Sequence, residues 1–200
     1  MNFQKCIWVM RAFVYKIVFK KVGFPSYIGK PIYIRNGKNI ILGNKVRIYP
    51  GMRAEIVDKN SYLAIGNNVS IGQNFHVVSY GEKLEIRDNT TISGNVLITN
   101  CDHSYSEIGT HILLQPLKRD TTRIGEGCFI GYGAVIQAGT ILGKQCIIGA
   151  NSVVRGNFPD YAVIVGSPAR IIKIYDPESK VWMSHTNIEI SAHRRRACRC

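Results

Sequence analysis

Aliphatic residues recur at every sixth position through the middle of this chain. In the longest unbroken run, successive hexads begin with Ile124, Ile130, Ile136, Leu142, Ile148 and Val154. Three upstream runs hold three hexads each, beginning with Leu42, Ile48 and Ala54, with Ile65, Ile71 and Val77, and with Ile86, Ile92 and Ile98. A short fixed period of this kind predicts a solenoid, in which each repeat buries its apolar face only against its neighbours.

The places where the period breaks indicate the shape of the coil. Extra residues occur only after Ala54, Val77 and Ile98, and each break follows the third hexad of a run. If three hexads make one coil, all these insertions emerge at the same corner of a triangular prism, where a loop leaves the stacked sheets intact. The sequence therefore predicts an all-β, parallel β-solenoid of about five coils from residue 42 to about 159, with strands about 4.8 Å apart.

The remaining hexad positions suit the corners and the interior of such a prism. The fourth position holds residues that tolerate left-handed backbone angles, namely Asn68, Asn74, Asn89, Asn95, Gly127, Gly133, Gly139, Asn151 and Asn157. The fifth position is mostly small or apolar and is expected to point inward, at Val46, Val69, Thr90, Val96, Cys128, Ala134, Thr140, Cys146 and Ser152. Cys128 and Cys146 are one coil apart, so they are expected to stack as buried small residues and not as a disulfide or metal pair.

The segments on either side of the repeats have different patterns. From Asn2 to Lys21, apolar residues recur at helical spacing with basic residues between them, which predicts a helix that caps the solenoid. The same helix could instead lie on an anionic membrane. We assign residues 1–41 to this helix and lead-in strands, 42–174 to the solenoid with a loop at 104–123, and 175–200 to an extension with a short helix over Val181 to Ile190.

Composition narrows the environment and the partners. The net charge of +13, from 26 basic and 13 acidic residues, favours anionic partners. Nucleic acid is not expected, because no recognisable motif accompanies the charge and four arginines lie in the tail Ser191 to Cys200. The six cysteines lack paired spacing, and no apolar stretch reaches eighteen residues. We therefore expect a reduced, cytoplasmic protein without a membrane-spanning helix.

A close resemblance to a known family is carried by the run from Ile124 to Lys173, IGEGCFIGYGAVIQAGTILGKQCIIGANSVVRGNFPDYAVIVGSPARIIK. This run resembles the carboxyl half of the hexapeptide-repeat acetyltransferases. Together with NVLITNCDHSY at Asn95 to Tyr105, it is similar to the branch of maltose and galactoside acetyltransferases and sugar O-acetyltransferases of surface polysaccharide synthesis. The resemblance implies a left-handed parallel β-helix, a homotrimer, acetyl-CoA as donor, and active sites in clefts between subunits.

Acetyl transfer from a thioester to a hydroxyl needs a base, hydrogen-bond donors for the oxyanion, and a site for a long anionic cofactor. The candidate base is His103, which lies where the third hexad of a coil ends and the loop begins. In the family the matching histidine is the general base. A surface or structural role is the alternative for any single histidine. His76 is expected at a different corner from His103, as a structural or acceptor-lining residue.

The other candidate residues divide between acceptor and donor. Acceptor binding is assigned to His76, Asn100, Asp102 and Tyr105, with local loop structure as the alternative for Asp102. The resemblance implies that Phe129, Gly131 and Tyr132 lie near the thioester, Ala150 and Arg155 along the pantetheine arm, and Arg170 and Lys173 at the phosphates. Relatives usually have tryptophan at the position of Phe129 and often a small residue at that of Tyr132. The backbone amide near Tyr132 is therefore the expected oxyanion donor. A merely exposed Arg170 is the alternative to phosphate binding.

These observations predict an acetyl-CoA-dependent O-acetyltransferase that modifies a sugar hydroxyl in surface polysaccharide synthesis and needs no metal. The alternatives are an N-acetyltransferase for an amino sugar, a serine O-acetyltransferase, and a non-catalytic solenoid scaffold. A zinc hydratase would need three well-placed histidines, which the five in this chain do not offer. Because the repeats begin near residue 42 with no nucleotide-sugar domain before them, a glycan or lipid-linked sugar is the favoured acceptor.

Overall fold

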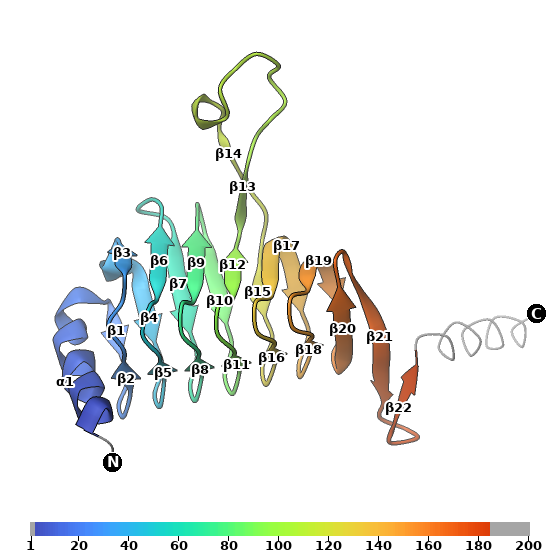
Figure 1. Cartoon of the computed structure of the whole chain (residues 1–200), viewed down its shortest axis with the longest axis horizontal. Helices are drawn as coiled ribbons and strands as arrows, with labels where there is room; N and C mark the ends of the chain where they lie inside the picture. Colours follow the sequence, from blue (N-terminus) through green and yellow to red (C-terminus); the bar gives the residue numbers. More distant parts are fainter. Residues whose placement is uncertain (1–2, 185–200) are drawn as a thin grey trace, which may run out of the picture.

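Short parallel strands stack rung upon rung into a prism, with one helix at its amino-terminal end and a stalk rising from its side (Figure 1). The computed structural model describes residues 3–184. Strands from successive coils pair in parallel along the faces of the prism, with one extra antiparallel layer at the carboxyl end. The parallel β-solenoid predicted from the hexad period is confirmed.

Each coil contributes one strand to each of three faces. The first face stacks β1 (Lys21–Val22), β4 (Ile40–Leu42), β7 (Tyr62–Ile65), β10 (Lys83–Ile86), β15 (Arg123–Ile124) and the end of β17 (Val135–Leu142). The second face stacks β2 (Tyr27–Ile28), β5 (Arg47–Ile48), β8 (Ser70–Ile71), β11 (Thr91–Ile92), β16 (Phe129–Ile130), β18 (Ile147–Ile148) and β20 (Ala162–Gly166). The third face stacks β3 (Tyr33–Arg35), β6 (Arg53–Ile56), β9 (His76–Ser79), β12 (Leu97–Thr99), the start of β17 and the start of β19 (Val153–Phe158).

The prism begins one coil earlier than the repeat analysis predicted. Strands β1, β2 and β3, expected only as a lead-in, pair in register with the next coil. Val22, Ile28 and Ile34 keep the hexad spacing among themselves, but Leu42, which stacks on Val22, follows Ile34 by eight residues instead of six. The two extra residues lie in the connection that includes the 3₁₀ turn η1 (Gly37–Asn39). The glycines in this segment are needed for stacking, because a Cβ at Gly23 would lie 2.4 Å from the backbone of Gly43.

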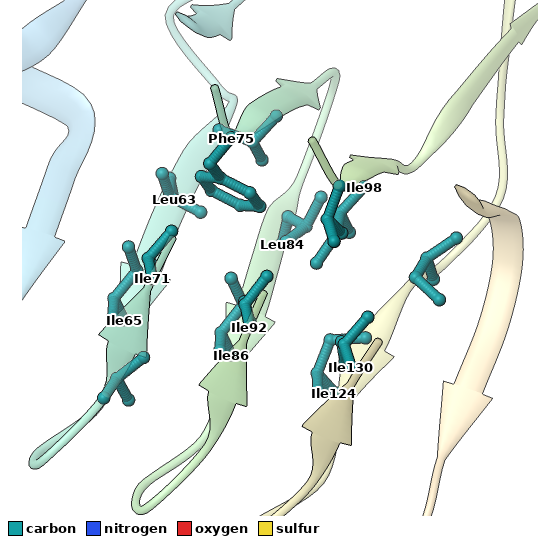
Figure 2. Packing of buried hydrophobic residues seen from close by; sticks show 14 of the residues in the cluster. Leu63, Ile65, Ile71, Phe75, Leu84, Ile86, Ile92, Ile98, Ile124 and Ile130 are labelled. Atoms are coloured by element: carbon teal, nitrogen blue, oxygen red, sulfur yellow. The ribbon is translucent and has the colours of Figure 1, made fainter. Parts of the chain in front are cut away.

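Ladders of inward aliphatic side chains form the core. Figure 2 shows two of them: Ile65, Ile86 and Ile124 follow one another on the first face, and Ile71, Ile92 and Ile130 on the second. All six are at most 2% exposed, so each coil covers the apolar surface of the next. Every residue predicted to point inward at the fifth hexad position is buried as well.

The stacking of Cys128 and Cys146 is also confirmed. Both thiols are free, and the hydrogen bond between them together with burial raises the pKa of Cys128. In the part of the chain that the structure describes, Cys6 and Cys101 are free too.

Left-handed backbone angles occur at eight of the nine corner positions that the sequence predicted, and the exception is Asn157. There the chain turns at Gly156, with a φ of 114°, and Asn157 continues β19 opposite Ile141. The hexad is shortened at this point, so the next corner falls on Tyr161, with a φ of 59°. The last coil therefore departs from the period that the earlier coils follow.

Both ends of the prism are covered. Helix α1 (Phe3–Val18) packs on β1 and β2, as expected for a cap. At the other end, β20 pairs antiparallel with β21 (Ala169–Asp176), and β21 with β22 (Val181–Ser184). The helix predicted from Val181 is wrong over these four residues, because the free edge of β21 offers them backbone partners. The rest of that segment and the tail Ser191 to Cys200 lie outside the described residues.

The long connections leave the prism where the breaks in the period predicted. The segments after β6, β9 and β12 all link the third face to the first. The longest becomes the stalk (residues 100–122), whose antiparallel strands are β13 (Cys101–His103) and β14 (Leu117–Arg119), with the 3₁₀ turn η2 (Ile112–Leu114) near its tip (Figure 1). No described helix is long and apolar enough to cross a membrane.

A matched pair of substitutions tests the ladder. Ile130→Ala removes a fully buried rung, whereas Ile147→Ala shortens a 39% exposed side chain on the neighbouring strand. We expect Ile130→Ala to lower the free energy of unfolding by about 2–5 kcal/mol and Ile147→Ala to cost far less, measured by urea denaturation. Equal losses would contradict the assignment of the core.

Candidate active site

The base of the stalk is tied firmly to the prism. Asn100 is completely buried: its Oδ1 accepts a hydrogen bond from the Tyr80 amide at 2.8 Å, and its Nδ2 donates to the Tyr80 carbonyl at 3.1 Å. Thr122 Oγ1 donates to the Thr99 carbonyl at 2.9 Å, and Arg119 Nη1 to the Gly81 carbonyl at 3.1 Å. Because its amide is buried and engaged, Asn100 supports the stalk, and its role in acceptor binding stays a prediction.

The tip of the stalk also has a defined shape. The Gln115 side chain is 6% exposed, donates from Nε2 to the carbonyls of Glu107 and Thr110, and accepts from the Glu107 amide. Tyr105 is 82% exposed and does not line the pocket beside the stalk. Its acceptor role stays a prediction.

His103 lies on β13 opposite Leu117 and lines a pocket of about 390 Å³. Among the described residues, no hydrogen bond or ion pair engages its imidazole, so both ring nitrogens are open to a ligand. The stalk base fixes the backbone on one side of His103, and the pocket lies on the other. This is the arrangement expected of a base that must meet a bound hydroxyl.

The floor of the pocket is the outward surface of the third face. Thr99, Val78, Glu55 and Arg35 occupy equivalent positions on successive rungs, from β12 back to β3. His76 and Leu97 form a parallel column beside them. With Val57, these side chains make a surface that is apolar near the stalk and charged toward the amino-terminal end.

His76 belongs to this pocket and not to a separate corner, which corrects the sequence prediction of its position. Its Nε2 lies 2.8 Å from Glu55 Oε1, and Arg53 Nε donates to the same oxygen at 2.7 Å. The hydrogen bond from Arg53 lowers the pKa of Glu55 most, and the one from His76 lowers it further. Glu55 therefore stays ionised at neutral pH and accepts a hydrogen bond from His76 Nε2.

Asp102 turns away from His103, as expected for neighbours on a strand. Its Oδ2 lies 3.3 Å from Arg155 Nη1, and Arg155 Nη2 lies 3.9 Å from Asp120 Oδ2. These ion pairs join the stalk to β19 on the carboxyl-terminal side. They support the local structural role of Asp102 and show Arg155, expected along the cofactor, sharing its charge with two carboxylates.

Apart from Arg155, which contacts Asp102 at the edge of the pocket of His103, the residues assigned to the donor lie away from that pocket. Phe129 is 45% exposed on the second face and lines a groove of about 430 Å³ with Tyr161, Tyr175 and Trp182. Arg155 and Arg170 line another groove, of about 480 Å³, and Lys173 lies on β21. None of the donor residues lines the pocket that contains His103.

Gly131, Tyr132 and Ala150 lie together at one corner of the prism. The Asn151 amide donates to the Tyr132 carbonyl, and a Cβ at Gly131 would lie 2.6 Å from the Ala150 nitrogen. The Tyr132 hydroxyl accepts a hydrogen bond from Asn95, which holds its ring against the prism. A side-chain role of Tyr132 in catalysis therefore gains no support, and the oxyanion contact through the backbone amide stays a prediction.

Sequence reasoning missed two charged residues that line the pocket, Arg35 and Glu55, and it missed Arg53, which binds Glu55. Arg53 precedes His76 by 23 residues, which is one coil with its insertion, and Glu55 lies two residues after Arg53 on the same strand. Counting outward residues from one coil to the next would have placed Glu55 beside His76.

No group of three or more His, Cys, Asp and Glu side chains suited to a metal occurs within residues 3–184.

Comparison with known proteins agrees with this architecture. The family model described as bacterial transferase hexapeptide (six repeats) matches residues 121–156. WbbJ of Escherichia coli K12, a putative lipopolysaccharide biosynthesis O-acetyl transferase, is 33% identical over 159 residues, which cover 76% of this chain and 80% of the relative. The chain belongs to the hexapeptide-repeat acetyltransferase family.

Two further proteins are similar to this chain. The galactoside O-acetyltransferase of Escherichia coli K12 is 27% identical over 88% of this chain and 74% of the relative. AntD, an N-acyltransferase from Bacillus cereus solved with dTDP and 3-hydroxybutyryl-CoA, superposes with a TM-score of 0.70 at 21% identity, over 95% of this chain and 97% of AntD. The second likeness shows a shared fold.

The support of the stalk can be tested at Asn100. Asn100→Ala leaves the Tyr80 amide and carbonyl without their partner, at a cost of about 1–3 kcal/mol. We expect faster amide hydrogen exchange through β13 and β14 and faster trypsin cleavage after Lys118, with the coils unchanged. Ser104→Ala, which removes an exposed hydroxyl of the same stalk, is the control. Exchange that rises throughout the prism, or nowhere, would contradict the local role of Asn100.

Proposed function

We propose that this protein is an acetyl-CoA-dependent O-acetyltransferase that modifies a sugar hydroxyl during surface polysaccharide biosynthesis. The observation that carries the proposal is the unpartnered imidazole of His103, held by a fixed stalk against a pocket of about 390 Å³. The similarity to WbbJ and to a galactoside O-acetyltransferase supports a sugar hydroxyl as the acceptor. Acetyl-CoA is the co-substrate, and no metal takes part.

In this mechanism His103 removes the proton of the acceptor hydroxyl. The hydroxyl oxygen attacks the thioester carbonyl carbon, and a backbone amide near Tyr132 holds the resulting oxyanion. Collapse of the tetrahedral intermediate breaks the carbon–sulfur bond. The imidazolium returns its proton to the departing thiolate, so the products are the acetyl ester and coenzyme A.

The donor groove fits an anionic cofactor. Arg155 and Arg170 face one groove at the carboxyl-terminal end, and Lys173 follows on the same strand as Arg170. Guanidinium groups bind phosphates through paired hydrogen bonds. Ala150 and Gly131 supply closely stacked backbone for the pantetheine arm.

A homotrimer would complete the site. The pocket of His103 lies on the third face, whereas Phe129 lies on the second and Tyr132 at the corner that follows. One prism therefore does not bring base and donor residues to one cleft, and the stalk of one subunit can meet these residues on a neighbour. The contact is head-to-tail, because it joins different surfaces of the two subunits, and three such contacts can close into a ring.

We further propose that α1 attaches the enzyme peripherally to the cytoplasmic face of a membrane, near a lipid-linked acceptor. Trp8 packs on Tyr27 and Tyr49, and Ala12 is 4% exposed, so one side of the helix faces the prism. The opposite side presents Phe3, Met10, Val14 and Ile17, which are 61–78% exposed. An amphipathic helix with its apolar side outward is suited to a lipid interface.

The charge around α1 agrees with an anionic lipid surface. Residues 1–54 contain eleven basic residues and no acidic one, and Lys5, Lys16, Lys20 and Lys21 are exposed on or beside the helix. Each such charge near an anionic leaflet contributes about 1 kcal/mol. The free cysteines of the described residues fit a reducing compartment, which supports the cytoplasm as the place of the reaction.

The proposed chemistry is tested by following thiol release from acetyl-CoA with a panel of free sugars, oligosaccharides, nucleotide sugars, amino sugars and serine. We expect transfer to a sugar hydroxyl, and a loss of at least about 100-fold in kcat for His103→Ala with the KM for acetyl-CoA little changed. His111→Ala, on the same stalk, is the control. Transfer only to amines or to serine would contradict a sugar hydroxyl as the acceptor. Full activity of His103→Ala would contradict the role of His103 as the general base.

Membrane attachment is tested by sedimentation with vesicles. We expect binding to vesicles with 30% phosphatidylserine, weakening as salt rises, and little binding to pure phosphatidylcholine. Met10→Asp with Val14→Asp should reduce binding at least tenfold. Val181→Asp, an exposed valine at the other end of the prism, should leave it unchanged. Binding that survives the helix substitutions would contradict the role of α1.

A further inference from the structure

The pocket beside His103 is longer than one sugar ring. Its lining reaches from the stalk across β12, β9 and β6 to Arg35 on β3. Stacked strands lie about 4.8 Å apart, so this floor extends for about 14 Å. A single pyranose bound at His103 would fill only the end of the pocket nearest the stalk.

The part of the pocket farther from His103 is organised by an ion-paired group that the transfer reaction does not use. Glu55, two rungs below the stalk, accepts hydrogen bonds from both Arg53 and His76. The Glu55 and His76 side chains are 25% and 37% exposed, so both are held in place yet reach the surface. With His76 Nε2 bound to Glu55, its Nδ1 is the ring nitrogen left without a partner in the described structure.

This chemistry suits a neutral, polyhydroxylated ligand. Carboxylate and imidazole groups accept or donate hydrogen bonds to sugar hydroxyls, and Val57, Val78 and Leu97 offer an apolar floor for the C–H face of a ring. No phenylalanine, tyrosine or tryptophan lines the pocket to stack on a nucleobase.

We propose that the acceptor is an oligosaccharide of at least two sugar units, and that Glu55 and His76 bind the ring next to the one that is acetylated. The inference rests on the proposed function of His103, and it defines the class of acceptor. Glu55 acts by holding His76 and by accepting hydroxyl hydrogen bonds, and neither residue takes part in the transfer of the acetyl group.

The test compares acceptors of different length that share one reacting sugar. Glucose, galactose, rhamnose and N-acetylglucosamine are each supplied as the monosaccharide, disaccharide, trisaccharide and nucleotide-linked sugar. We expect kcat/KM to rise at least tenfold from one unit to two. Glu55→Gln and His76→Gln should each lower kcat/KM about tenfold for the disaccharide, and less than twofold for the monosaccharide and for acetyl-CoA.

Glu85→Gln is the matched control. Glu85 is also an outward glutamate, 26% exposed and ion-paired with Lys83 and Arg87, but it lies on the first face. The Glu85→Gln substitution should leave kcat/KM unchanged for every acceptor. A general loss of stability would lower kcat/KM equally for short and long acceptors. It can therefore be distinguished from the expected loss, which is confined to the longer acceptors.

Equal kcat/KM values for one unit and two, or a preference for the nucleotide-linked sugar, would overturn the inference while leaving the proposed function intact. Absence of transfer to every acceptor would count against the proposed function itself. In that case calorimetric binding of the trisaccharides, present in the native protein and lost in Glu55→Gln, still supports the subsite. Absence of such binding overturns it.

Discussion

Stacking of inward aliphatic side chains between successive coils is the constraint on which the rest of this molecule depends. A coil cannot bury its own apolar face, so Ile65, Ile86 and Ile124 must remain in register for each to be covered. Any inserted residue inside a face would move an inward side chain outward. Long segments are therefore confined to one corner, and the stalk rises from that corner.

The same stacking divides the site in space. The stalk leaves between the fourth and fifth coils, so outward residues of earlier coils form the pocket of His103, and those of later coils form the grooves assigned to the donor. Asp102 and His103, adjacent on β13, both line the pocket, and Asp102 also pairs with Arg155 on the carboxyl-terminal side. Catalysis then requires only that acceptor and thioester meet at the foot of the stalk.

The sequence predicted most of the fold because one period specifies the core, the corners and the sites of insertion together. It failed where the period is interrupted: two extra residues separate Ile34 from Leu42, and the corner expected at Asn157 moves because the last hexad is shortened. His103 was proposed as the base because it adjoins a break in phase and matches the histidine of the family it resembles, and this role stays a prediction. The burial of Asn100 and the pairing of Glu55 with His76 depend on contacts between coils about 20 residues apart, which no local motif records.

A crystal structure with coenzyme A and an acceptor oligosaccharide bound tests most directly the claim that the stalk separates the two substrates. The account predicts the acceptor over β12, β9 and β6, the coenzyme along the later coils of a neighbouring subunit, and both the thiol and the reacting hydroxyl within about 3–3.5 Å of the His103 imidazole. Coenzyme A lying over Glu55 and His76, or an imidazole remote from both substrates, would contradict it.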